Sequence, residues 1–164
     1  MNRITWVLLV SLIASASEAQ QLLTPEEEKI DSLIMMYVEQ NQVVPKQEDI
    51  QKSNWKSLDA LGVRTLEFSG RKKFKLTSNG SGGKYQKEQG SWYIYDKYIV
   101  LETRKGKIPV YVIRHSNKTI LLDQENLDIM KKLIRGFVAG DQWMGYLTED
   151  DVLGFLNGFE KYDS

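Results

Sequence analysis

The sequence predicts an α+β domain in which an antiparallel meander of about six strands, curved or partly closed into a barrel, is flanked by helices. Three observations predict this class. Apolar residues recur at helical spacing near both ends of the chain, whereas in the middle they alternate with a period of two between tight turns. No helical pattern separates one strand from the next, which argues against a parallel sheet. We expect helical segments at 24–58 and 124–162 and the meander at 63–123.

The first nineteen residues have the composition of a secretory signal peptide. Arg3 precedes an apolar run from Ile4 to Ile13, and small residues then lead to an A-x-A-like site at Ser17-Glu18-Ala19. The run is about ten residues long, whereas roughly 20 are needed to cross a bilayer. We therefore expect cleavage after Ala19, with Ala16 as the alternative, and a single mature domain at 20–164.

Charge and cysteine content narrow the class of protein. The chain has 22 basic and 22 acidic residues, and cleavage would remove Arg3 and Glu18, so the mature chain stays neutral. A neutral chain has no overall electrostatic signature for nucleic acid or anionic lipid. The chain has no cysteine, which excludes disulfides, thiolate metal sites and the acylated cysteine of a lipoprotein. We expect an exported protein, periplasmic or secreted, with no stable membrane anchor and no nucleic-acid partner.

The N-terminal helical segment opens on a strong start signal. Thr24-Pro25-Glu26-Glu27 combines an N-cap threonine, a proline at the first helical position and a glutamate that closes a capping box. An apolar stripe follows as far as Val38, and the helix is expected to end near Asn41. A short second helix is predicted over Gln47–Trp55.

The rest of the chain divides into strands and then helices. The predicted strands are 63–68, 72–77, 85–95, 98–102, 108–113 and 119–122. Gly90 lies inside the third strand and indicates a bulge or bend. Helical spacing then predicts a helix that ends near Gly140 and a last helix that starts at Thr148 and reaches Phe159. Gly154 and Gly158 weaken this last helix.

The sequence offers little for catalysis. His115 is the only histidine, and it lies in or beside a turn with Ser116 next to it and no carboxylate at a recognisable motif spacing. A surface turn histidine is the preferred interpretation, although a catalytic triad does not require its members to be close in sequence. One histidine without cysteine provides too few of the ligands that zinc uses. We expect no catalytic residue, no metal and no cofactor.

The densest basic stretch is Arg71-Lys72-Lys73-Phe74-Lys75. Alternation places Arg71, Lys73 and Lys75 on one strand face, which is typical of a solvent-exposed face and of edge protection. Binding of an acidic partner through this strand is the alternative interpretation.

The aromatic residues are the best candidates for a ligand site. Alternation places Trp92 on one face of its strand and Tyr93 and Tyr95 on the other, and the next strands also carry apolar bulk on both faces. One face can fill the interior of the sheet while the other receives the helices, or a cavity can be lined partly by tyrosine and tryptophan. The candidate ligand-binding residues are Trp92, Tyr93, Tyr95, Tyr98 and Tyr111.

These strands carry a resemblance. The series Gly90-Ser91-Trp92-Tyr93-Ile94, then Tyr98 to Leu101, Val110 to Ile113 and Thr119 to Leu122, resembles the central strands of small lipocalin-like domains from exported bacterial proteins. The resemblance covers residues 63–123. It implies an antiparallel barrel and a binding role without catalytic residues. Six strands are fewer than the usual eight, and Trp55 lacks the glycine of the G-x-W that opens such barrels.

The sequence therefore favours a non-catalytic binding module for a small apolar molecule or a protein partner. Two alternatives remain open. The first is an NTF2-like enzyme whose cone-shaped cavity would use a tyrosine or aspartate as acid–base. The second is a surface-interaction or inhibitor protein that has no pocket.

Overall fold

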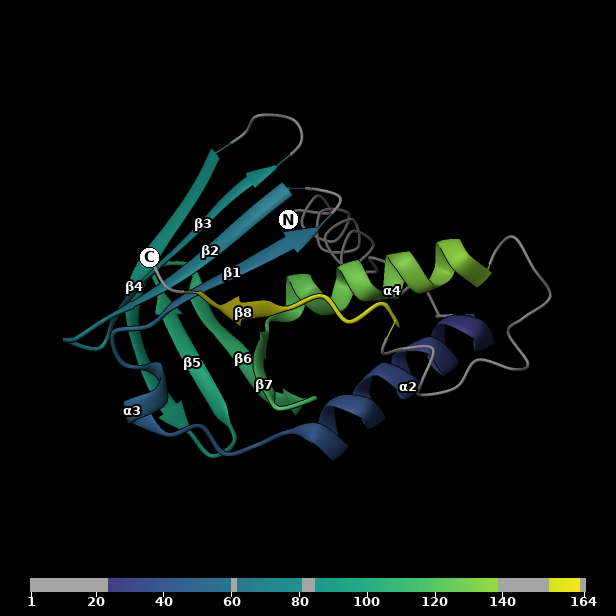
Figure 1. Ribbon diagram of the computed structural model, residues 1–164. Coiled ribbons are helices and arrows are strands. Elements are labelled where there is room, and N and C mark those ends of the chain that lie inside the picture. The colour runs from purple at the N-terminus through teal and green to yellow at the C-terminus, as the bar shows by residue number, and fades with distance from the viewer. Residues whose placement is uncertain (1–23, 60–61, 81–84, 139–153, 163–164) are drawn as a thin grey trace, which may run out of the picture.

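The computed structural model describes residues 24–59, 62–80, 85–138 and 154–162. Eight antiparallel strands form a closed barrel, and two long helices lie side by side against one part of its wall (Figure 1). The helices are α2 (Pro25–Asn41), α3 (Gln47–Ile50) and α4 (Gln124–Val138). The strands are β1 (Asn54–Asp59), β2 (Gly62–Ser69), β3 (Lys73–Gly80), β4 (Tyr85–Tyr95), β5 (Tyr98–Thr103), β6 (Gly106–His115), β7 (Lys118–Leu122) and β8 (Phe159–Lys161).

Each strand pairs with the next along the chain, and β8 closes the barrel between β7 and β1. β8 is only three residues long, and it pairs through Phe159 and Glu160 with β7 and through Glu160 and Lys161 with β1. The predicted antiparallel meander with flanking helices is confirmed, but the predicted number of about six strands is wrong. Eight strands remove the free edges that an open six-stranded sheet would leave.

The two missed strands lie in segments where a helix was predicted. The helix expected over Gln47–Trp55 ends at Ile50, because the chain turns at Lys52, which has a left-handed φ of 58°. Trp55 is then the second residue of β1. The helical spacing of the sequence predicts that Phe159 ends the last helix, but in the structure Phe159 begins β8.

The predicted start of the first helix is confirmed. The Thr24 side chain accepts a hydrogen bond from the Glu27 amide and the Glu27 carboxylate accepts one from the Thr24 amide, which completes the capping box. The helix ends at Asn41, as expected. The predicted signal peptide, the predicted helix end near Gly140 and the predicted helix start at Thr148 lie outside the described residues. None of the described helices is long and apolar enough to cross a bilayer.

The buried apolar residues form two clusters, one inside the barrel and one outside it. The outer cluster lies between α2, α4 and the outer faces of β6 and β7, and it includes Ile34, Ile113 and Met130. Ion pairs Lys131–Asp31 (3.0 Å) and Arg135–Glu27 (2.9 Å) join the two helices over it. The inner cluster fills the barrel with side chains from every strand and from α3. The two long helices thus cover the sector of the wall formed by β6 and β7.

At two positions, neighbouring strands approach each other so closely that only glycine fits. At Gly90 in β4, a Cβ atom would overlap the backbone carbonyl oxygen of Glu102 and lie 3.2 Å from the ring of Phe74. The predicted bend at Gly90 is therefore a point of contact between neighbouring strands. At Gly158, a Cβ atom would overlap Ile120 on β7. Gly158 lets β8 approach β7 closely enough to close the barrel.

We predict that Gly90→Ala destabilises the protein, whereas Gly136→Ala does not. The new methyl group at Gly90 can be accommodated only by moving backbone, and such overpacking costs about 1–3 kcal/mol. Gly136 lies in α4 with open space around its Cα, so alanine there should stabilise the helix by up to about 1 kcal/mol. Urea unfolding of both variants measures the two effects. Equal stability of the two variants would contradict the close approach at Gly90.

Candidate functional site

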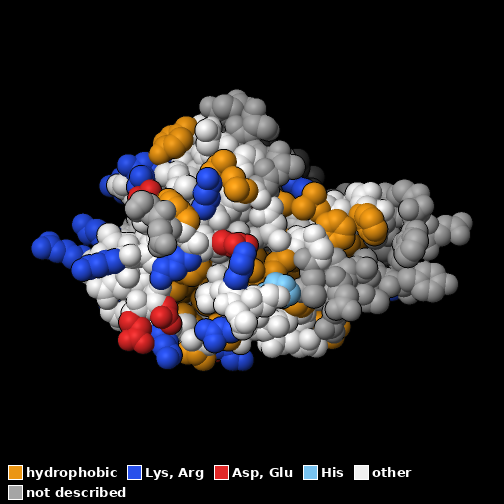
Figure 2. Space-filling view, in the orientation of Figure 1, with side chains coloured by type: hydrophobic (Ala, Val, Ile, Leu, Met, Phe, Trp, Pro, Cys, Tyr) orange, Lys and Arg blue, Asp and Glu red, His pale blue; other side chains and the backbone are white. Residues whose placement is uncertain are grey.

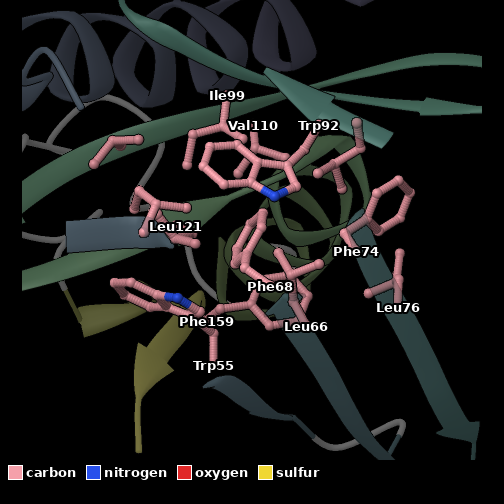
Figure 3. Packing of buried hydrophobic residues seen from close by; sticks show 13 residues of the cluster. Trp55, Leu66, Phe68, Phe74, Leu76, Trp92, Ile99, Val110, Leu121 and Phe159 are labelled. Carbon is pink, nitrogen blue, oxygen red and sulfur yellow. The ribbon is translucent and has the colours of Figure 1, made fainter. Parts of the chain in front are cut away.

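The middle of the barrel is packed with aromatic side chains (Figure 3). Trp92 is 1% exposed and meets Phe68 edge to face, with ring centroids 5.2 Å apart. Its indole nitrogen has no hydrogen-bond acceptor among the described residues, and Figure 3 shows it on the edge of the indole turned toward Phe68. Trp55 is satisfied, because its Nε1 donates to the Ser53 hydroxyl at 2.7 Å. These buried rings pack against one another as a protein core.

The five predicted ligand-binding residues do not form one site. Trp92 points into the barrel, whereas Tyr93, Tyr95, Tyr98 and Tyr111 lie on its outer face. Tyr98 pairs in register with both Tyr95 and Tyr111, and the rings of Tyr98 and Tyr111 are 5.2 Å apart. Tyr95 is 69% exposed.

The other two tyrosines of this face have separate surroundings. Tyr93 has the ammonium of Lys107 5.8 Å from its ring centroid. Tyr111 packs against the helical cluster, and burial raises its pKa. None of the five predicted residues lines the cavities described below.

A cavity of about 520 Å³ opens at the end of the barrel that α3 partly covers. We call this end the α3 end and this hollow the α3-end cavity. Its apolar lining includes Ile50, Trp55 and Val112, which belong to the inner core. The segment that links α2 to α3 passes over it and is fixed by a hydrogen bond from the Val43 amide to the Val112 carbonyl (2.8 Å). The cavity is thus a cup with the aromatic core at its base.

Basic side chains surround this apolar base. Arg114 follows Val110 and Val112 on the inward-facing positions of β6, and Lys161 follows Phe159 on β8 and pairs in register with Trp55. Lys46 borders the cavity from the linking segment. None of these three cations has a hydrogen bond or ion pair from its side chain among the described residues.

The charge around the α3-end cavity is positive overall. The fourth basic residue there, Lys118, is 2.9 Å from Glu160, and the second acidic residue is Asp49. Four basic side chains thus face two acidic ones, an excess of two positive charges. Figure 2 views the molecule from the same side as Figure 1 and shows hydrophobic side chains lying deeper between Lys, Arg, Asp and Glu side chains on this face. An apolar base with unpaired cations fits a small molecule that carries both an apolar body and an acidic group.

The opposite end of the barrel is built differently. Here Arg64, 4% exposed, donates to both carboxylate oxygens of Asp123 (3.0 and 2.5 Å) and lies 3.0 Å from Glu125. Asp123 also caps α4 by accepting from the Asn126 amide (3.0 Å). The guanidinium carbon lies 4.9 Å from the ring centroid of Phe159 in β8. A cavity of about 270 Å³ lies beside this pair. Three carboxylates and Arg64 border it, together with two glutamines, Ser78 and the apolar side chains of Leu76 and Ile108.

The lone histidine is not organised for catalysis. His115 Nδ1 lies 3.0 Å from the Tyr37 hydroxyl and Nε2 lies 3.0 Å from the Ser116 hydroxyl. Burial raises the pKa of Tyr37, so its phenol stays neutral at physiological pH and cannot supply the charge that a triad aspartate supplies to the imidazolium. If the phenol donates to Nδ1, then Nε2 carries the proton and cannot accept one from Ser116. No group of three or more His, Asp and Glu side chains among the described residues is arranged to hold a metal ion.

The sequence contained a signal for two of the missed residues, Arg64 and Arg114, and none for the other two, Lys46 and Lys161. Arg64 alternates with Leu66 and Phe68, so a charge on the buried face of β2 was visible in the pattern. Arg114 likewise continues the inward series of Val110 and Val112. No local pattern brings Lys46 and Lys161 together. Lys161 reaches the cavity because β8 pairs with β1, and Lys46 reaches it because it lies directly before α3.

Comparisons of this chain with protein-family models, with curated proteins and with solved structures give no match.

We predict that Arg64→Met lowers the free energy of unfolding by about 3–5 kcal/mol, because it leaves the buried Asp123 carboxylate without its cation. The matched control is Lys75→Met. It removes an ion pair to Glu67 of 3.3 Å whose two side chains are each about 40% exposed, and it should cost no more than about 1 kcal/mol. Urea unfolding gives both values. Similar losses in the two variants would show that the buried pair has no special role.

We predict that Tyr37 makes the protein less stable at alkaline pH. Its pKa is raised above 10.0 in the folded state, so its stabilising effect is complete below the unfolded value and is lost as pH rises through the folded one. The free energy of unfolding should fall less steeply above pH 10 in Tyr37→Phe than in the wild type. Tyr95→Phe, at an exposed site, should follow the wild type. Parallel curves for all three proteins would contradict the burial effect.

Proposed function

We propose that this chain is an exported, non-catalytic binding protein with a lipocalin-like barrel, and that its ligand occupies the α3-end cavity. The observation that carries the proposal is the set of three unpaired cations, Lys46, Arg114 and Lys161, around the apolar base formed by Trp55 and Val112. Unpaired like charges held close together repel one another, and an anionic ligand removes that cost.

The size and lining of the cavity support a small ligand. Its volume of about 520 Å³ lies within the range of roughly 300–1,000 Å³ typical of small-molecule sites. Because the aromatic core blocks the path further into the barrel, the ligand would bind at the mouth, with its apolar part on Trp55 and its acidic part at Arg114 and Lys161. The ligand class is therefore an amphipathic anion rather than a wholly apolar molecule.

The placement of ionisable groups favours binding over catalysis. An NTF2-like enzyme would need a free acid or base facing its cavity with a pKa tuned by burial. The buried acid Asp123 is engaged by Arg64 and by the start of α4, and the tyrosines proposed as acid–base groups face outward. The α3-end cavity has Asp49 and Glu160 at its border, and Glu160 is paired with Lys118.

A matched pair of fluorescent probes tests the proposal. The anion 1-anilinonaphthalene-8-sulfonate and the neutral N-phenyl-1-naphthylamine share an apolar body and differ in the sulfonate. We expect the sulfonate probe to bind the mature protein and to bind the Arg114→Gln/Lys161→Gln variant at least about tenfold more weakly, because charged hydrogen bonds are worth about 1.5–3 kcal/mol each. The neutral probe should bind both proteins alike.

The control is Lys132→Gln, which removes an exposed charge from α4, away from the cavity, and should leave the sulfonate probe unaffected. Native mass spectrometry of protein purified from its export compartment should also detect a retained acidic molecule that the double variant lacks. Sulfonate-probe binding that is unchanged in the double variant, together with no difference in retained mass, would overturn the proposal.

A further inference from the structure

We propose that the α3 end of the barrel docks on an anionic membrane surface. In an up-and-down barrel, alternate turns lie at the same end, so the β2–β3, β4–β5 and β6–β7 turns all lie at the α3 end. Direct contacts confirm the grouping: the Gln51 side chain donates to the Gly70 carbonyl at 3.2 Å, and the Gln42 side chain donates to the Lys97 carbonyl at 3.0 Å.

The α3 end carries a cluster of exposed basic side chains, on the β2–β3 and β4–β5 turns, at the start of β3 and between α3 and β1. The cluster consists of Lys52, Arg71, Lys72, Lys73 and Lys97. None of the five forms a side-chain ion pair within the described part of the chain. The acidic residues at this end, Glu48, Asp49 and Asp96 among them, are fewer than the basic ones once the three cations of the α3-end cavity are added. Figure 2 shows Lys and Arg side chains projecting from the side where Figure 1 places the β2–β3 turn.

The opposite end of the barrel does not share this excess. There Lys105 is 2.7 Å from Glu88, Lys107 is 3.9 Å from Glu102 and Arg64 is held by Asp123. Arg104 and Lys87 are also exposed toward this end without an ion pair among the described residues, but the carboxylates there nearly balance the basic side chains. The described charges are therefore nearly balanced at this end, whereas cations are in excess at the α3 end.

Exposed apolar side chains stand among the cations. Tyr95, next to the β4–β5 turn, is 69% exposed, and Val44, in the segment that crosses the α3-end cavity, is 65% exposed. A protein partner would need a continuous apolar patch at the centre of the contact, whereas these two side chains belong to separate segments. Basic side chains on several turns, with a tyrosine and an aliphatic side chain between them, suit the headgroup layer of a membrane. There each cation acts independently and tyrosine occupies the interface.

Sedimentation with lipid vesicles tests the proposal. The mature protein should bind vesicles of phosphatidylcholine with phosphatidylglycerol and not vesicles of phosphatidylcholine alone, and added salt should release it. The variant Arg71→Glu/Lys73→Glu should bind at least about 25-fold more weakly, because each removed cation is worth roughly fivefold in partitioning. Tyr95→Ser should weaken binding without changing its dependence on salt.

The matched control is Lys87→Glu/Lys132→Glu, which reverses two exposed charges on β4 and α4 away from the α3 end. It should bind vesicles almost as the wild type does. Equal loss in both double variants would mean that only net charge matters, and it would overturn the proposal. Absence of binding to either vesicle would also overturn it and would leave an acidic protein as the chemistry that fits the cluster.

The two proposals fail separately. Arg71→Glu/Lys73→Glu leaves the lining of the α3-end cavity intact, so it should bind the sulfonate probe normally. Loss of vesicle binding with retained probe binding is the expected result. Far-UV circular dichroism of the same sample verifies that the variant is folded. Loss of both kinds of binding in a folded variant would mean that one long-range electrostatic field accounts for both, which would overturn the docking surface as a distinct site.

Discussion

The structure depends on how three residues of β8 close the barrel, and the buried Arg64–Asp123 pair is the interaction that holds this closure. Arg64 extends from β2, reaches Asp123 where β7 ends and α4 begins, and passes over the ring of Phe159 in β8. A second polar link runs from Ser57 on β1 to Asn157 just before β8 (3.0 Å). A buried ion pair adds little net stability, but it penalises any arrangement that separates the charges. Here it favours the one register in which a very short strand can join β7 to β1.

A barrel closed in this way has consequences for where binding can occur. Eight strands enclose just enough space for side chains, and Trp55, Phe68, Trp92 and Phe159 use it. The middle of the barrel is therefore a packed aromatic core, and an open hollow lies at each end. One hollow is bordered by three carboxylates and one arginine, and the other by four basic and two acidic side chains. Inward-facing positions are apolar in the middle of the barrel and charged near its ends. The two ends differ because the inward Arg64 is paired with Asp123, whereas the inward Arg114 and Lys161 at the α3 end have no ion pair among the described residues.

Much of the fold could be predicted from the sequence, because it depends on local signals. The capping box at Thr24, the alternation of the central strands and the turn at Asp96 each specify their own conformation. β8 could not be predicted in this way, since three residues are too few to display a period of two and Phe159 also fitted a helical spacing. The tyrosines were correctly separated from Trp92 by alternation. Which of the two faces would become the interior is a property of closure, and no local pattern carries it.

The net charge of the sequence is likewise a poor guide to binding, because it does not show where the charges lie in the folded chain. Equal numbers of basic and acidic residues argued against nucleic acid and anionic lipid as partners, and that argument assumes that the charges are mixed in space. In the folded chain, Lys105 and Lys107 face carboxylates at one end, while Lys52, Arg71 and Lys72 stand on turns at the other without an ion pair among the described residues. Antiparallel topology is what sorts them, because it gathers every second turn at one end. Composition fixes the sum of the charges, and topology determines the field that a partner meets. The α3-end cavity opens into that field, so an acidic ligand would be drawn toward the same end that we propose to rest on an anionic surface.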